Sequence, residues 1–298
     1  MRQLNKFYFP RQDEKILVHT SHYDESGLLL KETAYNENGT FESETTYAYN
    51  ENRQVIKEIT TGIDEWDKTI TEYHYQSDGK LLQERNVYPD GTFEHTDYFY
   101  EGDMTYITCY DVEGNILSKQ EVKKENGKFI SLVEKDSEKN IIQSKEMMYG
   151  KNGLEEKEIF ILFQELKMEV STWQYNENGD TTGSVTRYYT FDEYSKIEEN
   201  DAFLTAKQTS ADKKTRHESF YENYADPSEN RKDISEFSEN GLLLKSEALN
   251  PSEELFYCYE YEYNQLNEEI AVKKTVPYNF VKYFGHGYLF RYERDYYK

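Results

Sequence analysis

Hydrophobic and polar residues alternate along much of the chain with the period of two that is typical of β-strands. In the segment 41–49, Phe41, Tyr47 and Tyr49 fall on one face, whereas Glu42 and Glu44 fall on the other. The alternation predicts strands that have one half-apolar face and one solvated face.

The segment 255–263 is the most aromatic of these predicted strands. Tyr257, Tyr259 and Tyr261 form a ladder on one face, opposite Glu260 and Glu262. Because such a sheet cannot bury much area on both sides, we expect it to curl until its aromatic face closes on itself. The expected architecture is a curled, shell-like or solenoid sheet.

A tyrosine followed four residues later by glycine recurs along the chain, with turn-forming residues between the two. The pairs are Tyr23 and Gly27, Tyr35 and Gly39, Tyr75 and Gly79, Tyr110 and Gly114, Tyr149 and Gly153, and Tyr175 and Gly179. Glycine supplies the positive φ angle that a tight hairpin turn needs. Each unit therefore predicts a strand, a turn and a second strand.

The repeat has a regular spacing. Tyr49 and Tyr75 are 26 residues apart, as are Tyr149 and Tyr175, and Tyr75 is 13 residues from Tyr88. Thirteen residues accommodate one strand and one turn but leave no room for a crossover helix. We therefore predict an all-β fold, an antiparallel meander of repeated β-hairpins, and exclude a parallel α/β fold.

Three segments follow from where the repeat is present. Residues 1–189 are a hairpin-repeat region, and residues 233–298 are hairpin repeats with an aromatic C-terminal cap. Between them, residues 190–232 lack the repeat and are expected to be an irregular insertion or connector: a long loop, a pair of irregular hairpins, or a short helix around residues 201–207. The three segments are also compatible with one continuous domain.

Composition favours a folded chain over a disordered one. The 298 residues include 29 tyrosines, which offer large buried area and high strand propensity. No segment approaches the roughly 20 apolar residues that a membrane-spanning helix needs. The start of the chain lacks the apolar core of a secretory signal, so the expected location is cytoplasmic.

The hairpin units resemble a known repeat family. The segments YDESGLLLKETAY, YQSDGKLLQERNVY and YDVEGNILSKQEV are similar to the YD repeats of RHS-type proteins and of bacterial insecticidal toxin shells. They are also similar to antitoxin-labelled short-repeat proteins with MORN-like spacing. The resemblance implies a hairpin architecture. Only Tyr23-Asp24 and Tyr110-Asp111 keep the literal YD pair.

Catalytic and metal-binding motifs are absent from the sequence, so we expect no enzyme, no metal site and no cofactor. The sharpest candidate cluster is Glu72 and His74 with His95 and Asp97, two i, i+2 pairs on neighbouring hairpins that could share a face. Exposed polar strand residues explain this cluster more simply than a metal site does.

Charge is the main functional clue. With 58 acidic and 35 basic residues, the net charge is −23, which repels nucleic acid and anionic membranes and attracts a basic protein. The function expected first is a non-enzymatic protein-binding module, most concretely a bacterial immunity or antitoxin-like protein that occludes a basic toxin such as a nuclease domain. The alternative is a surface-associated structural or carbohydrate-binding repeat protein that stacks sugars on Trp66 and Trp173. Acidity that only maintains solubility is an equally simple explanation of the charge.

Candidate contact residues are carboxylates and aromatic rings. Glu42 and Glu44, together with Glu94 on a neighbouring hairpin, are expected on the solvated face, and Glu260 and Glu262 form a similar pair. The ladder of Tyr257, Tyr259 and Tyr261 would supply rigid aromatic anchors.

Overall fold

The computed structural model describes residues 2–11, 14–179, 181–191, 203–213, 215–223, 226–277, 281 and 288–296. These residues form one sheet of 22 antiparallel strands. The strands are β1 (Arg2–Arg11), β2 (Glu14–Tyr23), β3 (Leu29–Tyr35), β4 (Phe41–Tyr49), β5 (Val55–Thr61), β6 (Thr69–Tyr75), β7 (Leu81–Val87), β8 (Phe93–Glu101), β9 (Met104–Tyr110), β10 (Ile116–Glu125), β11 (Lys128–Asp136), β12 (Ile141–Tyr149), β13 (Glu155–Leu162), β14 (Lys167–Tyr175), β15 (Thr181–Thr190), β16 (Phe203–Lys213), β17 (Arg216–Asn223), β18 (Arg231–Phe237), β19 (Leu243–Leu249), β20 (Leu255–Tyr263), β21 (Glu269–Thr275) and β22 (Tyr288–Tyr296). Two short 3-10 helices, η1 (Glu65–Asp67) and η2 (Pro227–Glu229), lie in connections. The predicted all-β meander is confirmed.

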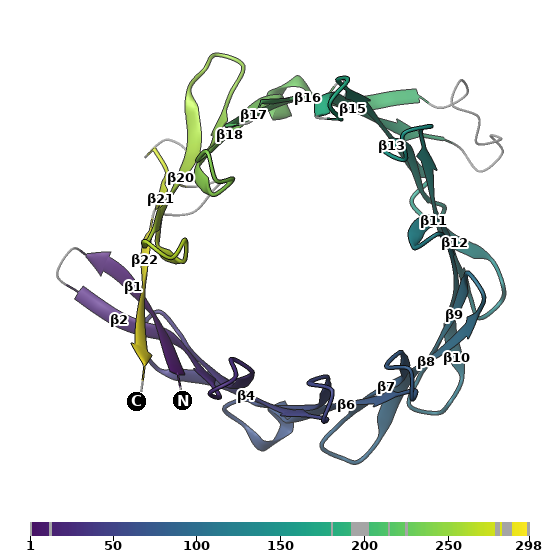
Figure 1. Ribbon diagram of the computed structural model, residues 1–298, viewed down its shortest axis with the longest axis vertical. Coiled ribbons are helices and arrows are strands. Elements are labelled where there is room, and N and C mark those ends of the chain that lie inside the picture. The colour runs from purple at the N-terminus through teal and green to yellow at the C-terminus, as the bar shows by residue number, and fades with distance from the viewer. Residues whose placement is uncertain are drawn as a thin grey trace.

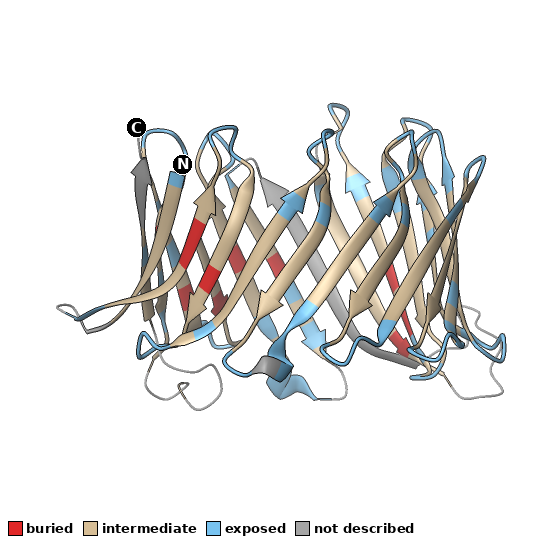
Figure 2. Cartoon of the chain, turned by 90° about the horizontal axis from the view of Figure 1, so that it is seen from below, coloured by how far each residue is buried: buried red, intermediate tan, exposed pale blue. Residues whose placement is uncertain are grey.

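The sheet returns to its own beginning. Each strand pairs with the next one along the chain, and β22 pairs with β1 over seven residues, from Arg2 opposite Tyr296 to Tyr8 opposite Phe290. The strands therefore form a ring, with both termini at the same rim (Figures 1 and 2). At about 4.8 Å between neighbouring strands, 22 strands make a ring at least about 34 Å across, too wide for side chains of opposite walls to meet.

The predicted hairpins are present and share one turn structure. In the first of them, the amide of Gly27 donates to the carbonyl oxygen of Asp24 at 3.2 Å, and the amide of Asp24 donates to that of Leu28 at 2.8 Å. The Asp24 carboxylate also accepts from the amides of Ser26 and Leu28, both at 2.8 Å. Gly27 has φ +87°, the left-handed conformation that makes glycine the preferred residue here.

A shift in strand register accompanies the turn. It falls next to the last residue of the strand that enters the turn, as at Tyr23, Tyr49, Tyr75, Tyr149 and Tyr175. An extra residue in one strand of a pair bends that strand and increases its twist. Regular bulges of this kind explain how a sheet of repeated hairpins acquires enough curvature to form a ring.

Tyrosine hydroxyls link successive turns on one rim. The Tyr75 hydroxyl donates to the carbonyl oxygen of Val55 at 2.8 Å, and Tyr49 does the same to Leu29 at 2.6 Å. Equivalent bonds join Tyr100 to Leu81, Tyr149 to Phe129, Tyr175 to Glu155 and Tyr263 to Leu243. Each tyrosine thereby fixes the first or second residue of the strand that leaves the preceding turn on the same rim.

The segment 190–232 continues the ring. Strands β16 and β17 lie within it and pair with β15 and β18, which corresponds to the hairpin alternative rather than to a helix over 203–207. Residues 192–202, 214 and 224–225 lie outside the described residues, as do 278–280 and 282–287 of the expected C-terminal cap. The described end of that cap, β22, is the strand that meets β1.

Few side chains are fully buried in this single-layered wall (Figure 2). The largest is Val170, which packs with Met168 and Tyr189 in a small apolar cluster. Stability therefore rests mainly on ladder hydrogen bonds and cross-strand side-chain pairs. In the described part of the chain, no helix is long and apolar enough to cross a membrane.

Replacing Tyr75 by Phe should lower the free energy of unfolding by about 1 kcal/mol, because it removes one hydrogen bond and keeps the aromatic side chain in place. Urea unfolding followed by circular dichroism measures the change. Tyr35→Phe is the matched control, since the Tyr35 hydroxyl makes no hydrogen bond among the described residues. An equal loss in both variants would contradict a role for the inter-turn bonds.

Replacing Gly27 by Ala should cost about 1 kcal/mol, because alanine is strained at this φ angle. The effect would be conformational, since nothing lies within 4 Å of the added Cβ. Glu253 occupies the equivalent turn position with φ +64°. Glu253→Gly should be neutral or stabilising by up to about 1 kcal/mol in the same unfolding assay.

Candidate functional site

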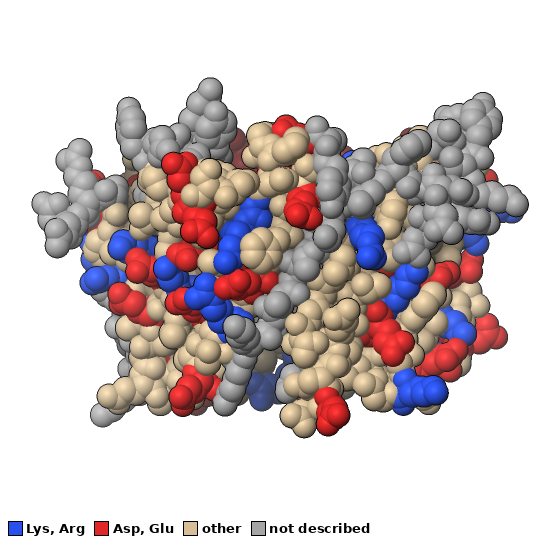
Figure 3. All heavy atoms as spheres, turned by 90° about the horizontal axis from the view of Figure 1, so that it is seen from above, with Lys and Arg blue, Asp and Glu red and all other residues tan. Residues whose placement is uncertain are grey.

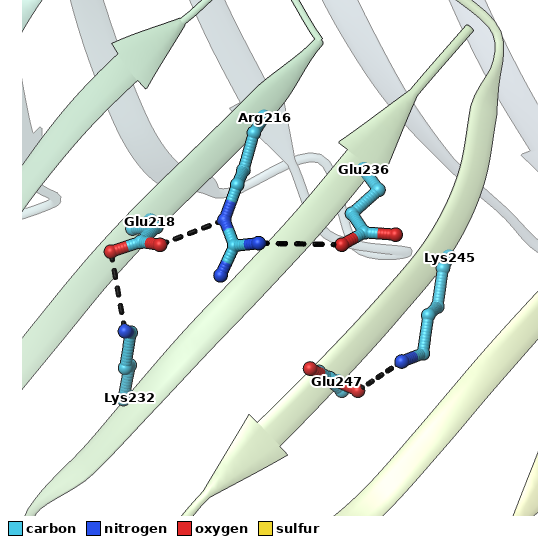
Figure 4. Close-up of polar contacts among 6 residues, drawn as sticks. All are labelled: Arg216, Glu218, Lys232, Glu236, Lys245 and Glu247. Carbon is cyan, nitrogen blue, oxygen red and sulfur yellow. Dashed lines mark hydrogen bonds and ion pairs between the residues drawn. The ribbon is translucent and has the colours of Figure 1, made fainter.

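The outer and inner faces of the wall can be assigned from a group of side chains that form polar contacts with one another. In Figure 4, Arg216, Glu218, Lys232, Glu236, Lys245 and Glu247 lie on the outward side of β17, β18 and β19, with the opposite wall of the ring behind them. Directly paired residues of neighbouring strands share a face. Following the register around the ring in either direction assigns the same residues to the outer face.

The outer face carries ladders of opposite charges. Glu218 accepts from Arg216 at 2.7 Å and pairs with Lys232 at 3.2 Å, while Arg216 also reaches Glu236 at 3.5 Å (Figure 4). Further pairs on this face join Lys31 to Glu44 at 2.6 Å, Lys57 to Glu72 at 3.0 Å, Lys135 to Glu121 at 2.8 Å and Lys273 to Glu260 at 3.0 Å. Basic and acidic groups are interspersed in Figure 3, so much of the outer charge is compensated locally.

The inner face is aromatic and hydroxylated. The rings of Tyr257 and Tyr259 lie 5.7 Å apart, and Tyr259 also contacts Tyr261 and Tyr288. Burial, with smaller effects from Tyr259, raises the pKa of Tyr288 to about 12. The Tyr288 hydroxyl therefore remains protonated at neutral pH and can donate a hydrogen bond.

Three glutamates, Glu32, Glu58 and Glu84, recur at 26-residue intervals on the inner face of β3, β5 and β7, and are called here the inner carboxylate row. Tyr47 donates to Glu32 at 3.0 Å, and Tyr73 donates to Glu58 at 3.2 Å. Successive members lie two strands apart and are offset by two residues, which places their Cα atoms about 12 Å apart.

The inner carboxylate row lacks lysine and arginine partners among the described residues. Glu58 and Glu84 have no lysine or arginine within ion-pair distance. The one ion-pair partner of Glu32 among the described residues is His19, at 3.7 Å between Nε2 and Oε1. Burial, followed by the charge of Glu58, raises the pKa of Glu84. The row can therefore accept cations that the chain itself does not supply.

The first member of the row, Glu32, borders a hollow of about 860 Å³. This hollow lies beside the seam between β1 and β22 and is also lined by Lys6, His19 and Tyr292. Lys6 sits 4.0 Å from the ring centroid of Phe290, and burial lowers the pKa of its ammonium group. The inner face is thus recessed where the carboxylate row begins.

The structure divides the contact residues predicted from sequence between the two faces. Tyr257, Tyr259 and Tyr261 lie on the inner face, whereas Glu42, Glu44, Glu260 and Glu262 lie on the outer face. The prediction that Glu94 shares a face with Glu42 and Glu44 is wrong. Glu94 pairs with Asn86 on the inner face, because its neighbour His95 pairs with Arg85 on the outer face.

Sequence reasoning missed the inner carboxylate row. Its members could have been found, because the 26-residue interval between Glu32, Glu58 and Glu84 equals the interval between Tyr49 and Tyr75. A side chain that repeats with the hairpin period must recur at the same position of successive hairpins.

The four residues of the predicted cluster share the outer face, and His95 Nε2 lies 4.0 Å from Asp97 Oδ2, but this pair does not reach Glu72. Arg85 of β7 lies between Glu72 and His95, and Glu72 pairs with Lys57 instead. His95 stacks on Tyr110 with ring centroids 4.3 Å apart. The described residues contain no group of three or more metal-ligating side chains.

Comparisons with known proteins found similarity among solved structures alone. No protein family and no curated protein sequence matches the chain. Among solved structures, it is similar to a porin-like protein from Bacteroides uniformis, with a TM-score of 0.33 and 10% identity over 99% of this chain and 97% of that one. A chain from the Photorhabdus luminescens Tc holotoxin pore gives a TM-score of 0.24 and 11% identity over 92% of this chain, which spans only 22% of that longer chain.

The raised pKa of Glu84 predicts a pH-dependent effect of Glu84→Gln. Between the unfolded pKa of about 4.3 and the higher folded pKa, the folded chain holds a proton that the unfolded chain releases, so Glu84 loses stabilising effect as pH rises. Glu84→Gln should match the parent below about pH 4 and become relatively more stable towards neutral pH.

Glu72→Gln is the control of opposite sign, because a hydrogen bond from Lys57 lowers the pKa of Glu72. Its contribution is present above the unfolded pKa and is lost on acidification, so the variant should be relatively less stable at neutral pH. Urea unfolding at pH 4 to 7 tests both, and parallel profiles for the two variants would refute the assignment.

Proposed function

We propose that this chain is a non-enzymatic module that binds a basic protein against the inner face of its ring, most concretely as a bacterial immunity or antitoxin-like protein that occludes a basic toxin such as a nuclease domain. The observation that carries the proposal is the inner carboxylate row, with no lysine or arginine partner among the described residues. A cytoplasmic location belongs to the same proposal.

The inner carboxylate row differs from the outer carboxylates that are paired with lysine. A ligand cation that approached Glu44 or Glu260 would have to compete with Lys31 or Lys273. Among the described residues, the carboxylate of Glu58 accepts a side-chain hydrogen bond only from the Tyr73 hydroxyl, so a ligand cation there would not compete with a lysine. Such a carboxylate gains a charge-assisted hydrogen bond when a lysine or arginine binds it.

The spacing of the row suits an extended basic segment. Residues i and i+4 of an extended chain point to the same side and lie about 13 Å apart, close to the interval of about 12 Å between row members. Tyrosines such as Tyr47 and Tyr73 flank the carboxylates and offer apolar surface for the aliphatic stems of lysine or arginine. The net charge of −23 would also speed association with a basic partner.

The YD-repeat resemblance is consistent with this proposal, since it implies a scaffold of repeated hairpins that presents one continuous face. A surface-associated carbohydrate-binding role is the second candidate. The observation in its favour is the exposed indole of Trp66, whose side chain could stack on a sugar.

The proposal is tested by immobilising the purified chain, passing a lysate of the source organism over it and eluting with rising salt. One basic protein, released by salt and inhibited by a stoichiometric amount of this chain, would support the immunity role. A captured basic protein whose activity is unchanged would leave protein binding but reject toxin neutralisation. Failure to capture a basic protein at low salt would reject the proposal.

The row itself is tested with Glu32→Gln/Glu58→Gln/Glu84→Gln. This triple variant should slow association of a captured basic protein, or of a deca-arginine peptide, by at least about fivefold at low ionic strength, and flatten the salt dependence. The matched control, Glu42→Gln/Glu260→Gln/Glu262→Gln, removes the same three charges from the outer face and should change the rate by less than about twofold. Equal slowing in both variants would mean that only net charge matters.

A further inference from the structure

The connection between β5 and β6 differs from the four-residue turns of the repeat. It spans residues 62–68 and contains η1. Two large apolar side chains point into solvent here: Trp66 is 78% exposed and Ile63 is 70% exposed. With Pro89 of the neighbouring connection, they line a hollow of about 560 Å³ on the rim opposite the tyrosine-linked turns.

Hydrogen bonds and close packing hold this loop in one shape. The amide of Asp64 donates to the Asp67 carboxylate at 3.2 Å, and the amide of Asp67 donates to the carbonyl oxygen of Asp64 at 3.0 Å. Gly62 packs so tightly that a Cβ there would lie 2.4 Å from that of Asp67. An exposed indole on a preorganised loop loses little conformational entropy on binding.

The charges around the hollow indicate what it accepts. The loop contains three acids, at positions 64, 65 and 67, against the single base Lys68. Asp90 follows Pro89 in the adjacent turn. Asp64 lines the hollow together with Lys68, and a guanidinium group can stack on the Trp66 indole and pair with the Asp64 carboxylate at once.

We propose that the Trp66 loop is a second contact surface, which docks an arginine side chain of the same basic partner at the mouth of the ring. This inference rests on the proposed function and adds an anchor outside the inner face. Glu58 lies three residues before the end of β5 at Thr61, about 10 Å along the strand, so one partner segment can reach both places. Trp and Arg are the residues most often found at energetic centres of interfaces.

Of the two tryptophans, Trp66 reports on the rim loop, and Trp173 reports on a part of the inner face far from the inner carboxylate row. Trp173 lies on β14, where Ser184 pairs with it. Trp173→Phe leaves Trp66 as the only indole, and Trp66→Phe leaves Trp173. Fluorescence titration of each variant with deca-arginine and deca-lysine peptides at low ionic strength therefore shows whether the bound peptide lies at the rim loop.

The expected result is a saturable change in Trp66 emission, stronger with deca-arginine than with deca-lysine. Trp66→Ala should weaken deca-arginine binding by at least about fivefold, with unfolding free energy unchanged because the side chain is exposed. Leu266→Ala, at another exposed apolar turn residue, is the control and should leave affinity unchanged.

Unchanged affinity in Trp66→Ala, with the glutamine triple variant still impaired, would overturn the rim site and leave the proposed function standing. Equal responses to the two peptides would overturn the assignment to arginine. No binding of either peptide would overturn both the rim site and the recognition of basic segments. A Trp66 response to oligosaccharides but to neither peptide would assign the loop to the carbohydrate alternative instead.

Discussion

The pairing of β22 with β1 is the contact on which the rest of the structure depends. An open sheet of this length would expose two strand edges with unsatisfied amides and carbonyls, which invite association with other chains. Closure satisfies both edges, yet it joins the two ends of the chain and needs every intervening hairpin to contribute the correct bend. The wall has little apolar core to absorb errors, since fully buried side chains such as Val170 are few among the described residues.

The repeated unit explains how this bend is achieved. A left-handed residue closes each turn, a register shift lies beside the tyrosine at which the chain enters the turn, and the tyrosine hydroxyl fixes the preceding turn of the same rim. The three features depend on one another. The register shift sets the position of the tyrosine side chain, and from that position its hydroxyl reaches only one backbone carbonyl. Turns on the opposite rim lack this link in the described hairpins, and the irregular connection at 62–68 lies there.

The division of charge between the two faces gives the ring its functional character. Several lysines on the outer face, such as Lys31 and Lys232, are paired with carboxylates across strands, which limits the contribution of these charges to long-range fields. The carboxylates of the inner row have no lysine or arginine partner among the described residues, and burial raises the pKa of Glu84. An acidic chain of this kind therefore concentrates its recognition chemistry on the surface that the ring encloses and on the rim beside it.

Sequence alone determined the strands, their two faces, the hairpin turns and the meander order, because alternation and turn chemistry act over a few residues. It also indicated the tyrosine ladder of Tyr257, Tyr259 and Tyr261. For the strands within 190–232, the sequence left a hairpin pair as one of three alternatives, since this segment lacks the tyrosine and glycine repeat. Pairing with β15 and β18 holds these strands in the ring.

Only the tertiary structure decided that the sheet closes through β22 and β1, and which residues outside the aromatic ladder turn inward. Glu32, Glu58 and Glu84 align there, while Glu94 and Glu44 are separated. A period of two distinguishes the two faces of a strand but not the inside from the outside. That choice depends on the sum of small bends over 22 strands, and face-sharing across strands depends on registers set by each bulge.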